Sequence, residues 1–177
     1  VNVDGGTDYR LRELEKAGIY HTERDADALL EQAFMGIARH ESDPADILEI
    51  EGRPIRVRRQ ARGVAWFDFA ELCDGPRGKA DYIELSRRYH TVLLSGVPRF
   101  GAQDADRLRR FVWLIDEFYD RRVKLIVAAA VPADRLVSDA DDDDKFQANL
   151  NASLRDRLVS RLTEMQTRAY LSEPHLP

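Results

Sequence analysis

The sequence predicts an α/β fold with a β-hairpin in its first half and parallel strands joined by a helix in its second half. Two apolar runs rich in β-branched residues, 91–97 and 123–131, have the composition of strands buried on both faces. The stretch between them repeats its apolar residues at three- and four-residue spacing, as one face of a helix does. A strand, a helix and a second strand in this order form a βαβ unit, which places both strands parallel in one sheet.

Composition and charge describe one soluble globular domain, for which we take the boundaries 1–177. Apolar residues make up 44% of the chain and charged residues 33%, and the net charge of -5 argues against general affinity for nucleic acid or anionic membranes. No apolar run approaches the roughly 20 residues that span a bilayer. The single cysteine, Cys73, fits a reducing compartment. We therefore expect a cytoplasmic protein without membrane insertion.

The first part of the chain is predicted to hold a helix and several strands. Residues 1–6, VNVDGG, indicate a short strand that starts without an initiator methionine, so we expect a carboxyl-terminal fragment of a longer protein. Residues 24–41 space their apolar side chains three and four apart, which predicts a helix. Residues 47–57 alternate on either side of the turn sequence EGRP and predict a hairpin. Residues 64–69 predict a third apolar strand.

The second part is predicted to follow a strand–helix–strand order. Residues 75–90 indicate a turn and a short helix, which lead into the strand at 91–97. Asp104 is a candidate N-cap for the next helix. The acidic run 139–144 lacks the central Gly and terminal Glu of a calcium loop, so it predicts a solvated loop. Residues 154–171 predict a closing helix.

Asp116 and Glu117 raise the question of an ATPase strand, because they directly follow the apolar run 111–115. In P-loop ATPases such a strand ends in an Asp that holds Mg²⁺ and a Glu that positions the attacking water. The apolar residues here recur instead at helical spacing over three turns. They are Leu108, Phe111, Val112, Ile115, Phe118 and Tyr119. We therefore predict a helix with both carboxylates on its solvated side.

The sequence contains no phosphate-binding loop G-x-x-x-x-G-K-[ST] to accompany a metal-binding strand. In the nearest candidate, GPRGKAD at 75–81, the glycines are too close together, and Ala80 follows Lys79 where a hydroxyl would be needed. Pro76 also lacks the backbone N–H that a phosphate would use. A turn leading into a helix is the better interpretation, so we do not expect this chain to hydrolyse ATP alone. The histidines show no metal-ligand spacing, and we propose no metal site.

Three segments, in this order, resemble the carboxyl-terminal half of the ZapE-like P-loop ATPases, a family with bacterial cell-division members and mitochondrial AFG-type relatives. They are LCDGPRGKADYIELSRRYHTVLLSGVP, RRFVWLIDEFYDRRVKLIVAAAVP and SRLTEMQTRAYL. VNVDGGTDYRLR is similar to the segment that follows the ATPase core in those proteins. In that family the phosphate loop and the Mg²⁺-binding strand precede the part that resembles this chain.

The resemblance implies a complete protein that binds ATP and Mg²⁺, hydrolyses ATP and acts in cell division or protein quality control. It also implies a protein partner, such as a division-site protein, and is compatible with an oligomer. Within this chain Arg161 and Arg110 are the candidate nucleotide sensors, because ATPases use remote arginines to stabilise charge on the γ-phosphate. The simpler alternative is that both are surface arginines paired with carboxylates.

The expected role of the chain is therefore the lid and partner-contacting part of the ATPase. Two other functions stay open, namely a non-catalytic protein-interaction domain and nucleic-acid binding. Nucleic-acid binding rests on arginines across the predicted hairpin, namely Arg53, Arg56, Arg58, Arg59 and Arg62. Trp66 and Phe67 fall in the next strand rather than interleaving with these arginines, and Glu49 and Glu51 are placed to pair with them. We therefore favour a solvated strand face.

Overall fold

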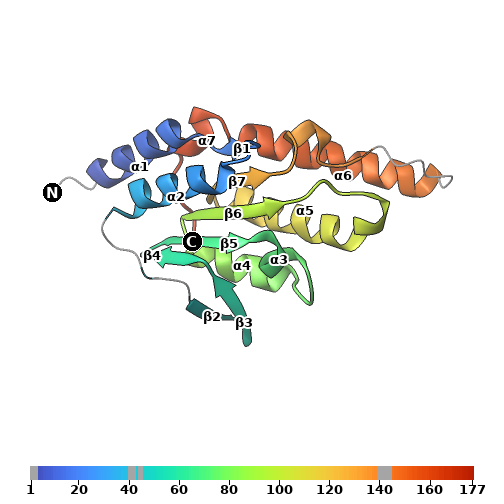
Figure 1. Ribbon diagram of the computed structural model, residues 1–177, viewed down its shortest axis with the longest axis horizontal. Helices are drawn as coiled ribbons and strands as arrows, with labels where there is room; N and C mark the ends of the chain where they lie inside the picture. The colour runs from blue at the N-terminus through green and yellow to red at the C-terminus, as the bar shows by residue number, and fades with distance from the viewer. Residues whose placement is uncertain (1–3, 40–42, 44–45, 139–144) are drawn as a thin grey trace.

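The computed structural model describes residues 4–39, 43, 46–138 and 145–177. A five-stranded sheet of order β1-β7-β6-β5-β4 forms the centre, and a two-stranded sheet, β2–β3, extends from the β4 side (Figure 1). The strands are β1 (Tyr20–His21), β2 (Asp46–Ile50), β3 (Arg53–Val57), β4 (Arg59–Ala61), β5 (Val64–Asp68), β6 (Thr91–Val97) and β7 (Lys124–Ala129). The helices are α1 (Asp4–Ala17), α2 (Ala26–Ala38), α3 (Phe69–Cys73), α4 (Lys79–Arg88), α5 (Ala105–Asp120), α6 (Lys145–Glu164) and α7 (Arg168–Ser172), with 3-10 turns η1 (Ala102–Asp104) and η2 (Ala133–Arg135).

The central sheet is mostly parallel, which confirms the predicted fold class. β5, β6, β7 and β1 run parallel, and only β4 is antiparallel to its neighbour β5. Thr91 of β6 is opposite Val64 of β5 on one side and Lys124 of β7 on the other. The connection β6–α5–β7 is the predicted βαβ unit, and β2–β3 is the predicted hairpin. Every residue of β7 is buried, as a strand covered on both faces requires.

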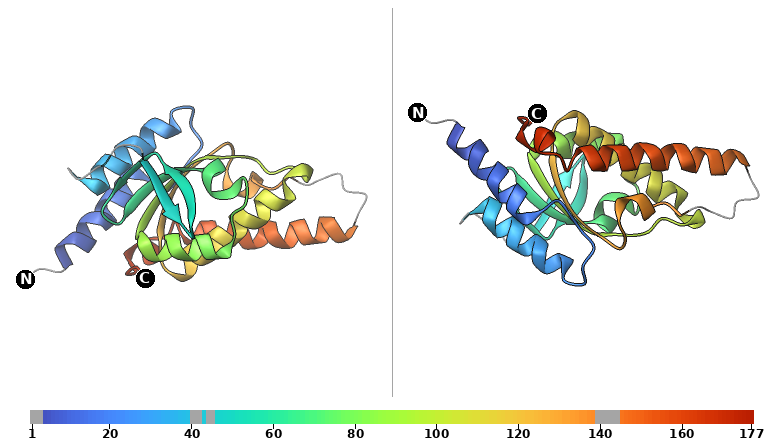
Figure 2. Two further views of the ribbon diagram at one scale, coloured as in Figure 1. Left: turned by 90° about the horizontal axis from the view of Figure 1, so that it is seen from below. Right: turned by 90° about the horizontal axis from the view of Figure 1, so that it is seen from above.

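Helices cover both faces of this sheet. Figure 2 shows α1 and α2 on one side and α4, α5 and α6 on the other. Phe34 of α2 packs near Trp66 of β5, with ring centres 6.4 Å apart. On the α5 side, Phe111 stacks against Phe100 and meets Phe69 edge to face. The sheet is therefore the middle layer of a three-layer α/β arrangement.

Asp116 and Glu117 lie on a helix, as the periodicity predicts. α5 spans Ala105–Asp120, and both carboxylates are half-buried. Asp116 does not lie on a solvated side as expected: its side chain is 19% exposed and faces α6, where it pairs with Arg157. Asp104 directly precedes α5 as expected, but its carboxylate accepts a hydrogen bond from the Gly101 N–H (2.8 Å) and so closes η1. The acidic pair therefore does not end a strand.

The predicted opening strand is wrong where the structure describes it. Residues 4–6 form the first turn of α1, and residues 1–3 lie outside the described residues. The helix forms because Leu14 is buried and α1 packs on α2 and α7. The edge strand at this side of the sheet is β1.

The closing helix consists of two helices rather than one. α6 ends at Glu164 and α7 begins at Arg168. Thr167 caps α7, because its Oγ1 accepts a hydrogen bond from the Tyr170 N–H at 3.2 Å. The predicted acidic loop at 139–144 lies outside the described residues.

Candidate functional site

Helix α6 presents Arg161, the first predicted sensor, toward α5. The guanidinium carbon lies 4.2 Å from the centre of the Tyr119 ring, and Nε lies 3.9 Å from Oδ1 of Asp116. This Nε is buried and has no hydrogen-bond partner among the described residues. Arg157, one turn earlier, makes the closer contacts to the same carboxylate, at 2.8 Å and 3.1 Å. Arg157 is therefore the main ion-pair partner of Asp116, and Arg161 is held mainly by stacking on the Tyr119 ring.

The ring under Arg161 belongs to a fixed aromatic pair. Tyr119 and Tyr170 are stacked, with ring centres 5.8 Å apart and planes inclined by 14°. The Tyr170 hydroxyl is buried and donates a hydrogen bond to the Val123 carbonyl at 2.6 Å, which ties α7 to the start of β7. Burial raises the pKa of Tyr170, and hydrogen bonding to Glu164 raises the pKa of Tyr119. Both rings are therefore neutral platforms for a cation at physiological pH.

Arg110, the second predicted sensor, lies on a different side of α5. It is nine residues from Tyr119, so the two point about 180° apart around the helix axis. Arg110 Nη1 donates to the Cys73 carbonyl at 3.1 Å. Cys73 itself is buried, and burial raises the pKa of its thiol to about 12. The structure does not bring Arg110 and Arg161 together.

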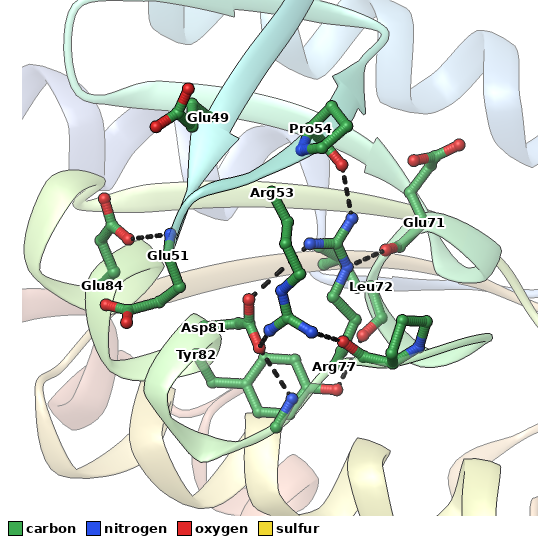
Figure 3. A network of polar contacts seen from close by, with 12 residues as sticks. Glu49, Glu51, Arg53, Pro54, Glu71, Leu72, Arg77, Asp81, Tyr82 and Glu84 are labelled. Atoms are coloured by element: carbon green, nitrogen blue, oxygen red, sulfur yellow. Dashed lines mark hydrogen bonds and ion pairs between the residues drawn. The ribbon is translucent and has the colours of Figure 1, made fainter.

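The GPRGKAD turn is built around a carboxylate instead of a phosphate. Asp81 is 1% exposed, and its Oδ2 accepts hydrogen bonds from the Gly78 N–H (2.8 Å) and Arg53 Nη2 (2.6 Å) (Figure 3). A phosphate loop would leave such an N–H for the nucleotide. Lys79 lies over the Trp113 ring, 5.4 Å from its centre. The turn and helix predicted here are confirmed, and the anion that they hold is internal.

The same network ties the hairpin to α4. Arg77 donates from Nη2 to the Pro54 carbonyl (2.8 Å) and from Nε to the Glu71 carbonyl (3.2 Å), and Figure 3 shows it beside Asp81. Its Nη1 lies 3.7 Å from Oδ1 of Asp81, and neither atom has a hydrogen-bond partner among the described residues. Arg53 reaches Asp81 from β3. The network therefore carries two cations around one buried carboxylate.

The hairpin arginines pair with helices rather than with the glutamates expected across the turn. Arg58 contacts Asp27 at 3.3 Å, and Arg59 contacts Glu31; both carboxylates belong to α2. The register places Glu49 opposite Pro54, which explains why the expected cross-strand pairing differs. Arg58 also stacks on Trp66, with 4.3 Å between the guanidinium carbon and the ring centre. Arg58 and Arg59, two of the arginines on which nucleic-acid binding would depend, are thus paired with carboxylates of the same chain.

Within residues 4–39, 43, 46–138 and 145–177, no group of three or more His, Cys, Asp or Glu side chains is arranged to hold a metal ion. Over the same residues, no helix combines the length and the apolar character that crossing a bilayer needs.

A mostly parallel sheet with helices on both faces is a layered α/β architecture, and it is consistent with the fold of P-loop ATPases. The chain belongs to the AFG1-like ATPase family, whose sequence profile matches residues 1–174. This finding confirms the resemblance to the ZapE-like ATPases.

Two relatives illustrate the match. The chain is 37% identical over 180 residues to the cell division protein ZapE of Escherichia coli (strain K12), covering 99% of this chain and 45% of that protein. It is 33% identical over 198 residues to lactation elevated protein 1 homolog B of Danio rerio, covering 96% of this chain and 39% of that protein. The chain thus spans less than half the length of these relatives. No solved structure matches it significantly.

Proposed function

We propose that this chain is the carboxyl-terminal part of an AFG1-like ATPase and that its helix α6 responds to nucleotide held by an ATPase core outside the chain. Family membership and the partial coverage of longer relatives support an ATPase core that lies outside this chain. The absence of a phosphate-loop sequence in the 177 residues supports it as well. The complete protein would bind ATP and Mg²⁺ and hydrolyse ATP.

The observation that carries the proposal is the incomplete pairing of Arg161. Its Nε is buried without a hydrogen bond, and the carboxylate beside it already binds Arg157. An arginine in this state retains hydrogen-bonding capacity for a phosphate oxygen, and a guanidinium forms its strongest bonds with such anions. Leaving the Tyr119 ring would cost about 0.5–1 kcal/mol at a partly exposed site, which a phosphate contact exceeds.

The names of the relatives support a proposal for the cellular role. By analogy with ZapE, whose name describes a cell division protein, we propose that the complete protein couples ATP hydrolysis to cell division in the cytoplasm. A division-site protein would be the partner, and an oligomer is compatible with the proposal. In a mitochondrial setting the corresponding role would be protein quality control.

A non-catalytic protein-interaction domain is the second candidate. Ile47 in the hairpin strand β2 is 61% exposed and gives this hairpin an apolar side chain that another protein could contact. On this alternative the chain would contribute binding alone. ATP turnover of the complete protein would then be insensitive to Arg161.

The test is ATP turnover of the complete protein with Arg161→Ala, compared with Arg157→Ala and Arg110→Ala. We expect Arg161→Ala to lower turnover by tenfold or more, as the loss of a transition-state charge contact does, with an unchanged circular dichroism spectrum. Arg157→Ala is the matched control on the same helix and retains turnover. Wild-type turnover in Arg161→Ala would contradict the proposal, and a loss in Arg110→Ala alone would move the sensor to the opposite side of α5.

A further inference from the structure

A cavity of about 390 Å³ opens at the amino ends of β5 and β6. Its walls come from α1, the end of α2, the turn between β4 and β5, and the residue before β6. Parallel α/β sheets bind their usual ligands outside the carboxyl ends of the strands, at the opposite edge. This cavity lies at the other edge, and neither Arg161 nor Tyr119 lines it, so the inference below does not depend on the proposed function.

The cavity is basic although the chain as a whole is acidic. Arg10, Arg39 and Arg62 line it from three separate segments, whereas the net charge of the chain is -5. Among the described residues, no side chain that lines the cavity carries a carboxylate, and none of these three arginines forms an ion pair. Cations gathered in a concave site without counter-charges raise the local concentration of anions.

Neighbouring groups orient these arginines without neutralising them. The guanidinium carbon of Arg39 lies 3.8 Å from the centre of the Tyr9 ring, and the Tyr9 hydroxyl donates to the Gly36 carbonyl at 3.0 Å. Arg10 Nη1 lies 3.4 Å from Nε2 of His90. An aromatic ring and an imidazole thus fix two of the three guanidinium groups.

His90 is a neutral partner for Arg10. Burial, together with the charges of Arg10, His175 and Lys124, lowers the pKa of His90 to about 4. Its Nδ1 lies 2.8 Å from the Thr91 hydroxyl, so the hydrogen-bond pattern assigns the proton to Nδ1 and leaves Nε2 to accept from Arg10. The full positive charge of Arg10 therefore remains available to a ligand.

Contacts of Gly63 with His90 and Thr91 fix the turn that carries Arg62. Gly63 has a φ of +74°, and a Cβ there would lie 2.5 Å from the His90 ring. The Gly63 carbonyl accepts hydrogen bonds from the N–H groups of His90 (2.9 Å) and Thr91 (3.2 Å). Arg39, across the cavity, adopts a φ of +59°, in a region that non-glycine residues rarely occupy. Strained backbone of this kind clusters at ligand sites.

We propose that this cavity binds a small oxyanion ligand, a phosphate- or carboxylate-bearing molecule, between Arg10, Arg39 and Arg62. Guanidinium groups bind both anions through paired hydrogen bonds. The volume falls in the range of small-molecule sites, which are about 300–1,000 Å³. It is too confined for a nucleic-acid strand, whose binding needs an extended groove that tracks the backbone.

The test is calorimetric titration of the complete protein with inorganic phosphate and, separately, with malonate. Saturating ADP and Mg²⁺ are present throughout, so that a nucleotide site elsewhere is already filled. We expect saturable binding of at least one anion, and the tighter of the two identifies the phosphate or the carboxylate class. Arg62→Gln should weaken this binding by about 10- to 100-fold, the effect of losing one charged hydrogen-bond donor.

The controls separate this site from general basic charge. Arg87→Gln removes an exposed arginine of α4 outside the cavity and should leave the affinity unchanged. Arg62→Lys, which keeps the charge, should recover part of the loss. Because Arg62 is exposed, these substitutions leave the fold intact. Absence of saturable binding by either anion, or equal weakening in Arg62→Gln and Arg87→Gln, would overturn the proposal.

Discussion

Replacing Asp81 by asparagine tests the buried network that joins the hairpin to α4. The substitution keeps the shape of the side chain and can still accept the hydrogen bond from the Gly78 N–H, so the cap of α4 is retained. It removes the negative charge between Arg53 and Arg77. The Arg53 side chain is 40% exposed and can turn toward water, whereas that of Arg77 is only 9% exposed. The cost therefore arises mainly from a buried arginine left without its carboxylate.

The expected loss of stability is about 3 kcal/mol. Removing one partner of a buried ion pair costs about 3–5 kcal/mol. The lower end applies because Arg77 lies 3.7 Å from the carboxylate and keeps its bonds to the carbonyls of Pro54 and Glu71. In a domain of this size the melting temperature should fall by about 6–12 °C.

The assay is urea-induced unfolding of the chain at pH 7, followed by circular dichroism. Asp106→Asn is the control, because Asp106 is 76% exposed and its pair with Arg109 should contribute less than about 0.5 kcal/mol. Combining Asp81→Asn with Arg77→Met should recover part of the loss, since the unpaired cation is then gone. Equal unfolding midpoints for Asp81→Asn and Asp106→Asn would refute the reasoning.

Two further predictions concern stability. His90 has a folded pKa of about 4 and an ordinary value of 6.5, so the unfolded chain binds its proton first as the pH falls through this window. The free energy of unfolding should therefore decrease as the pH falls, by about 2 kcal/mol at pH 5. In urea unfolding at pH 7 and pH 5, His90→Gln should lack this loss of stability. The same pH dependence in His90→Gln and in the original chain would contradict the assignment of the loss to His90. Tyr170→Phe removes the donor to the Val123 carbonyl and should cost about 1–2 kcal/mol in the same assay, whereas an unchanged midpoint would show that this hydrogen bond contributes nothing.

Local periodicity predicted the elements that bury a large apolar surface. β6 covers the predicted residues 91–97, and the stripe that predicts α5 is buried at Leu108, Phe111 and Ile115. α1 could not be predicted in this way, because its apolar surface is sparse and Leu14 is the side chain that anchors it. Such a helix forms through tertiary packing on its neighbours rather than through its own pattern.

The candidate site was only partly predictable. Arg161 could be selected as an arginine of the closing helix, but its neighbours Asp116 and Tyr119 belong to α5, and only the fold brings them together. The only sequence signal for this site was the three-residue spacing of Asp116 and Tyr119, which places both side chains on one face of a helix. The hairpin shows the same limit, because the carboxylate that binds Arg53 is Asp81 of α4 rather than a glutamate across the turn.

The most direct test of the central claim is hydrogen exchange of α6 in the complete protein, with and without a non-hydrolysable ATP analogue and Mg²⁺. We predict that the analogue slows exchange of the amides around Arg161 and that Arg161→Ala abolishes this change. Identical exchange of α6 in the presence and absence of the analogue would contradict the claim that this helix responds to nucleotide.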